Sequence, residues 1–142
     1  TVESSGKSGM MILAAVILLG LTFPAILIPS GRKPMVTTVS DTALNIEGMY
    51  GMRVEYSKLK SCDTIASLPA IKAKTNGYAF GKILRGNFRL RTGEKVKMFI
   101  DKGNPPFIHL KTDDTDVFLN CHDSALTRNL FIDIRQQLGD KL

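Results

Sequence analysis

Hydrophobic and polar positions follow three different patterns along this chain. Met10 to Ile28 is apolar all round, with no charged residue over 19 positions. Residues 43–119 contain short stretches that alternate between apolar and polar positions with a period of two, and residues 124–138 repeat with a helical period. The patterns predict one apolar helix, then a run of short β-strands, then one amphipathic helix.

The alternating stretches predict antiparallel strands joined by tight turns. The turns fall at residues 48–51, 92–94 and 112–116, and Asn76-Gly77 is the strongest tight-turn dipeptide. Ser57 to Leu68 is ambiguous between a short helical turn and an irregular crossing. The predicted strands are Ala43–Glu47, Met52–Tyr56, Ile71–Thr75, Phe88–Arg91, Val96–Ile100, Phe107–Leu110 and Val117–Leu119.

The last periodic segment predicts a capping helix over about 124–138. Asp123 or Ser124 can cap its start, and Gly139 ends it. One face carries the apolar residues Leu126, Leu130, Phe131, Ile134 and Leu138. We therefore expect a mainly β domain, a small sandwich or open barrel, whose open end is plugged by this helix.

The apolar segment is long enough to cross a membrane. As a helix, its 19 residues span roughly 28 Å, close to a hydrocarbon core of about 30 Å. Arg32 and Lys33 follow it, which favours a cytoplasmic location for the C-terminal part. We expect a polar lead over residues 1–9, a transmembrane helix over 10–30, a linker over 31–42 and a folded domain over 43–139. A signal anchor and a further membrane segment upstream stay open as alternatives.

The charge of the chain is uneven. Its net charge is +6, and most of the excess lies between Lys72 and Lys102. Arg89 and Arg91 share a strand face by period two, as do Lys95 and Lys97 on the next strand, so the turn between them can join the four into one patch. The candidate partner surface is Arg85, Arg89, Arg91, Lys95 and Lys97. It suits an acidic protein or an anionic membrane surface, although an ordinary solvated hairpin shows the same pattern. Base-stacking aromatics are not interleaved with these cations, so nucleic acid is not expected.

The stretch from Leu44 to Leu138 resembles the bacterial pleckstrin-homology-like (PH-like) domains. The resemblance rests on "IEGMYG", on "TNGYAFGKILRGNFRL" and on "PFIHLKT…VFLNCHDSALTRNLFIDI". It implies a bent, seven-stranded antiparallel barrel capped by a C-terminal α-helix and following one or two membrane helices. Eukaryotic relatives bind phosphoinositides through bases in the first hairpin. The corresponding hairpin here offers only Arg53, so that role does not carry over.

The glycines of "TNGYAFGKILRGNFRL" raise the question of a nucleotide site. Gly77, Gly81 and Gly86 do not form G-x-G-x-x-G, and no helix follows them. We expect Gly77 in a turn and the other two at bulges or bends.

Cysteine and histidine are the remaining candidates for chemistry. Neighbouring side chains of a strand point to opposite faces, so Cys121 and His122 cannot form a nucleophile–base pair with each other. Cys62, Cys121, His109 and His122 show no zinc spacing. We expect no catalytic residue, metal or cofactor, and the sequence leaves open whether the two cysteines pair.

Together these observations predict a membrane-anchored, non-enzymatic PH-like binding or scaffolding module of bacterial type. It would be integral to the cell membrane through Met10–Ile28, with its folded domain in the cytoplasm, docking a protein partner or the anionic membrane surface. The alternative is a membrane-bound enzyme or enzyme subunit that uses the cysteines and histidines. The partner, the pathway and the oligomeric state are not determined by the sequence.

Overall fold

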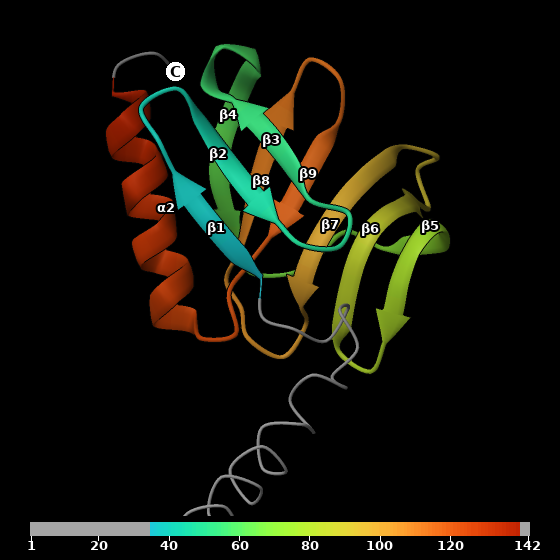
Figure 1. Ribbon diagram of the computed structural model, residues 1–142. Coiled ribbons are helices and arrows are strands. Elements are labelled where there is room, and N and C mark those ends of the chain that lie inside the picture. The colour runs from blue at the N-terminus through green and yellow to red at the C-terminus, as the bar shows by residue number, and fades with distance from the viewer. Residues whose placement is uncertain (1–34, 140–142) are drawn as a thin grey trace, which may run out of the picture. The chain divides into compact units, whose positions relative to one another are not determined.

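A computed structural model of the chain describes residues 35–139 (Figure 1). The chain divides into two compact units, Thr1–Lys33 and Pro34–Leu142. The predicted membrane segment lies outside the described residues. Within residues 35–139, no helix has the length and apolarity needed to cross a bilayer.

The first sheet has three antiparallel strands in the order β1-β2-β3. The predicted opening hairpin is confirmed, because β2 and β3 pair around residues 48–51, with Leu44 opposite Val54. β1 was not expected, since it lies in the segment interpreted as a linker. Its Thr37 is paired with Ile46 of β2. The strands are β1 (Val36–Val39), β2 (Ala43–Glu47) and β3 (Met52–Glu55).

The second sheet has six strands in the order β4-β8-β9-β7-β6-β5. Its neighbours are antiparallel except for β7 and β9, which are parallel. The fold is therefore mainly β with one C-terminal helix, and its two sheets are open, where the resemblance implies a bent seven-stranded barrel. The strands are β4 (Leu59–Ile65), β5 (Ile71–Phe80), β6 (Ile83–Leu90), β7 (Lys95–Asp101), β8 (Phe107–Thr112) and β9 (Asp116–Leu119).

The middle of the chain differs from the prediction in two places. The stretch left open after residue 56 begins with a short helical turn, η2 (Tyr56–Lys58), but then continues as the strand β4, which was not predicted. The Asn76-Gly77 turn is wrong, because β5 continues through it to Phe80 and the chain reverses at Gly81, whose φ is +59°. Gly77 instead faces Gly86 of β6. A Cβ on Gly77 would lie 2.5 Å from the Arg85 carbonyl oxygen, so the close approach of the strands requires glycine there.

The helix α2 (Ser124–Leu138) closes the chain as predicted. The Asp123 side chain accepts a hydrogen bond from the Ala125 N–H at 2.7 Å and caps the first turn. Gly139 ends the helix with a φ of +53°. Leu126 was placed on the buried face, but it is 46% exposed. It lies in the first turn, before the helix reaches the core, and buried Thr127 occupies the neighbouring inward position.

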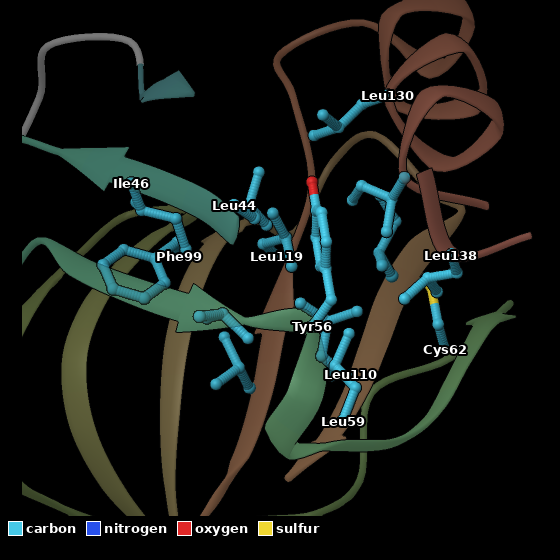
Figure 2. Close-up of a cluster of buried hydrophobic side chains, with 14 residues drawn as sticks. Leu44, Ile46, Tyr56, Leu59, Cys62, Phe99, Leu110, Leu119, Leu130 and Leu138 are labelled. Atoms are coloured by element: carbon cyan, nitrogen blue, oxygen red, sulfur yellow. The ribbon is translucent and has the colours of Figure 1, made fainter. Parts of the chain in front are cut away.

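The main hydrophobic cluster joins both sheets to the helix (Figure 2). Leu44 and Ile46 come from β2, Phe99 from β7, and Leu130 and Leu138 from α2. The Tyr56 ring stands among them, and its hydroxyl donates to the Ser40 carbonyl oxygen at 2.9 Å. This cluster fixes the helix against β4 and β8.

A second cluster lies among the strands of the larger sheet. Phe88 of β6, Met98 of β7 and Phe118 of β9 are almost completely buried in it. Leu68 of the crossing that leads from β4 to β5, and Ile71 at the start of β5, pack against it. Successive residues of β7 point to opposite faces of the sheet, and Met98 belongs to the second cluster whereas Phe99 belongs to the main one. The larger sheet therefore packs a hydrophobic cluster on each face.

Candidate functional site

Four of the five predicted cations gather around the turn between β6 and β7. Arg89 of β6 is directly opposite Lys95 of β7, and Lys97 is opposite Asn87. Arg91 lies in the turn and is exposed. The turn is held by the Leu90 N–H, which donates to the Glu94 carbonyl oxygen at 2.9 Å. The expectation that the two strands bring their bases together is met.

Arg85 does not belong to this surface. It is buried, with 8% of its surface exposed. Its Nη1 donates to the carbonyl oxygens of Leu84 at 3.0 Å and Ile100 at 2.9 Å, so the guanidinium ties β6 to β7. Burial lowers the pKa of Arg85, while the charge of Asp101 acts in the opposite direction. The inclusion of Arg85 in an exposed basic patch is wrong.

Two lysines that the site prediction omitted take its place. β5 begins beside the end of β6, with Ile71 opposite Leu90 and Ala73 opposite Arg89. Lys72 and Lys74 of β5 are exposed at this end of the sheet. The Arg91 N–H also donates to the Ala70 carbonyl oxygen at 2.9 Å, which holds the start of β5 near the β6–β7 turn. We call Lys72, Lys74, Arg89, Arg91, Lys95 and Lys97 the basic end.

The basic end is poorly neutralised by the fold itself. Among residues 35–139, the ion pairs are Arg53–Glu55, Lys58–Asp114, Lys60–Asp113 and His109–Asp116, and none includes a cation of the basic end. Like charges directly opposite on neighbouring strands repel. The Arg89–Lys95 pair therefore destabilises the hairpin, and a bound anion would relieve the repulsion.

The acidic turn between β8 and β9 lies next to this surface. The Thr115 hydroxyl donates to the Lys95 carbonyl oxygen at 3.1 Å. The acids of the turn lie near lysines of η2 and β4: Asp114 is 3.9 Å from Lys58 Nζ of η2, and Asp113 is 3.7 Å from Lys60 Nζ of β4. Asp113 and Asp114 therefore have lysine partners outside the basic end.

Cys62 and His109 lie on neighbouring strands but do not face each other. Cys62 is 2% exposed in the main cluster, and burial raises the pKa of its thiol to about 11. It pairs with Leu110 of β8, whereas His109 is the next residue and projects from the opposite face. His109 lies 2.9 Å from Asp116 through its Nε2 and stacks on the Phe118 ring, with 4.4 Å between ring centroids.

Cys121 lies in the short segment between β9 and α2. The Cys121 N–H donates to the Thr127 hydroxyl at 2.8 Å, and burial raises the pKa of its thiol. Both cysteines are free thiols. In the part of the chain that is described, no group of three histidine, cysteine or acidic side chains could hold a metal ion.

No family model, curated protein or solved structure matches this chain.

Proposed function

We propose that this protein is a membrane-anchored docking module, without enzymatic activity, whose basic end binds the anionic surface of the bilayer. The observation that carries the proposal is the Arg89–Lys95 pair, two cations held directly opposite each other beside the β6–β7 turn, with further cations at the same end of the sheet. An anionic headgroup or carboxylate between them would turn a destabilising pair into a binding contact.

The binding free energy expected from these cations is small, and it is sufficient only for a domain that is tethered to the membrane. A lysine or arginine near an anionic leaflet contributes about 1 kcal/mol, and this falls off within a Debye length of about 8–10 Å. Contacts of this size hold a free domain weakly. A chain anchored through Met10–Ile28 would keep its domain at a high effective concentration beside the bilayer, so that weak contacts suffice.

We also propose that the domain is related to the PH-like family. The order of the elements supports this, with a β-meander at the start, a second meander through β5, β6 and β7, and a capping helix at the end. The main cluster, which joins the helix to both sheets, supports it as well. The two open sheets and the parallel β7–β9 pair are departures from the bent barrel of that family.

The enzyme alternative has less support. A nucleophilic cysteine acts as the thiolate, and the raised pKa values of Cys62 and Cys121 keep both thiols protonated near neutral pH. His109 is already engaged with Asp116.

Hydrogen–deuterium exchange on the full chain in lipid nanodiscs tests the docking proposal. We expect slower amide exchange over residues 89–97 in nanodiscs that contain about one-third anionic lipid than in zwitterionic ones. The protection should disappear at about 1 M salt, where the Debye length is about 3 Å.

A matched pair of double variants provides the control. Arg89→Gln with Lys95→Gln should remove the protection, whereas Lys58→Gln with Lys60→Gln removes the same charge at the acidic turn and should leave it in place. Equal exchange in the two lipid compositions would refute docking to the bilayer. Protection that instead appears only with an acidic protein would assign the basic end to a protein partner.

A further inference from the structure

We infer that the hollow between the β4–β5 crossing and the β7–β8 loop is a binding site for a small apolar carboxylate. The hollow has a volume of about 490 Å³. This volume falls in the range of protein ligand pockets, about 300–1,000 Å³. The hollow is open to solvent on one side, and it is lined by Ala66, Ser67, Leu68, Pro69, Ile71, Pro105 and Phe107, with Lys102 as its single charged residue.

The floor of the hollow is part of the protein core. Phe107 is 4% exposed and belongs to the second hydrophobic cluster, on which Leu68 and Ile71 also pack. A flat or ring-shaped apolar group in the hollow would therefore contact the core directly. Removing that group from water is the main source of binding free energy for such a ligand.

The wall that carries Lys102 is rigid. Asn120, which is 2% exposed, braces it by accepting from the Asp101 N–H at 2.7 Å and donating to the carbonyl oxygens of Asp101 and Asn104, both at 2.8 Å. The Ser124 hydroxyl donates to the Pro105 carbonyl oxygen at 2.6 Å and joins the wall to the start of α2. The cation thus projects from a fixed backbone, a requirement for orienting a ligand.

The charge of Lys102 selects an anion. The adjacent carboxylate, Asp101, accepts from the Gly103 N–H and from Asn104 Nδ2, each at 3.1 Å. Lys102 forms no ion pair with any residue between 35 and 139. The opposite wall, residues 66–70, forms neither helix nor strand and supplies the Ser67 hydroxyl as a second polar group.

The inference is independent of docking through the basic end, since none of its residues lines the hollow. The test titrates the full 142-residue chain, in buffer or zwitterionic nanodiscs, with 2-naphthoate and with the neutral 2-naphthylmethanol. Methyl NMR shifts of Leu68 and Ile71 report occupancy of the hollow. We expect saturable shifts with the carboxylate at a Kd of about 1 mM or below, and weaker binding of the alcohol.

Two variants and one control decide the result. Lys102→Gln should weaken naphthoate binding about tenfold, the loss of one charged hydrogen bond. Ala66→Trp, at an exposed wall position, should fill the hollow and abolish the shifts. Lys82→Gln removes the same charge nearby and should leave binding unchanged. No saturable shift up to about 10 mM, or equal Kd values for the native chain and Lys102→Gln, would overturn the inference.

Discussion

Arg85 and Asn120 are polar side chains that the fold uses in its interior. Arg85 donates to the carbonyl oxygens of Leu84 and Ile100, and Asn120 bonds three backbone groups at the end of β7 and in the loop that follows it. The predicted strand Phe88–Arg91 did not include Arg85, which lies earlier in β6. Period-two alternation could not show which residues cover Arg85, because burial depends on segments distant in the sequence. Four of the five predicted cations therefore lie in the basic end, and the addition of Lys72 and Lys74 required the register of β5 on β6.

At the residue scale, the buried thiol of Cys62 predicts a loss of stability at alkaline pH. Its pKa is about 11 in the folded protein against an ordinary value of 9.0. Below pH 9 both states keep the proton and nothing is lost. Between these values only the unfolded state ionises, so the free energy of unfolding falls as the pH rises, by about 2 kcal/mol at about pH 10.5.

Comparison with Cys62→Ala isolates this contribution. The pKa values of Tyr56 and Cys121 are also raised, and their effect is common to both proteins. Urea denaturation of residues 33–142 measures the free energy of unfolding. Between about pH 8 and about pH 10.5 this free energy should fall less for Cys62→Ala than for the native sequence, although the cavity left by the substitution makes the variant less stable at every pH. Parallel losses in the two proteins would contradict burial of the thiol.

At the element scale, the sequence predicted most strands with local partners and failed where pairing overrides local signals. The hairpins β2–β3 and β8–β9 and the β6–β7 turn were predicted, because each joins alternating strands through a short turn. Asn76-Gly77 carries a turn signal but lies within β5, since Gly77 and Gly86 let the two strands approach closely. β4 was missed because its partner, β8, lies far along the chain.

The backbone conformation and the close contacts of Gly86 indicate a structural role for this glycine. Its φ is +108°, and an added Cβ would lie 2.7 Å from the Asn76 carbonyl oxygen and 2.8 Å from the Gly77 Cα. Gly86→Ala should therefore lower the stability by more than about 2 kcal/mol, through backbone strain and overlap together. Thermal melts followed by circular dichroism measure the change. The control Gly103→Ala meets mainly the flexible Lys82 side chain, and an equal effect from both would remove the structural role of Gly86.

The capping helix offers a comparison between two leucines one turn apart. Leu130 is 7% exposed in the main cluster, and Leu126 is 46% exposed. Leu130→Ala should destabilise the domain by about 2–5 kcal/mol and lower its Tm sharply. Leu126→Ala and the exposed Gln136→Ala should hardly change it. Equal small effects from all three would mean that the helix is not docked on the core.

At the scale of the whole molecule, the order of the strands could not be predicted. The β8–β9 hairpin inserts between β4 and β7, and β9 pairs with β7 in parallel. Alternation shows that a strand has a buried face, but it does not identify a partner twenty or fifty residues away. This long-range pairing gives two packed sheets in place of the bent seven-stranded barrel that the resemblance implied.

The division of the chain into two units predicts that residues 33–142 fold without the preceding segment. Both hydrophobic clusters are built from buried residues between Leu44 and Leu138, so removing residues 1–32 deletes none of them. In aqueous buffer this fragment should give a circular dichroism spectrum dominated by β-structure with a contribution from one helix. It should also melt in a single cooperative transition, as domains of this size usually do. A random-coil spectrum would mean that the first unit supplies part of the core, and the two units would then have to be treated as one folding domain.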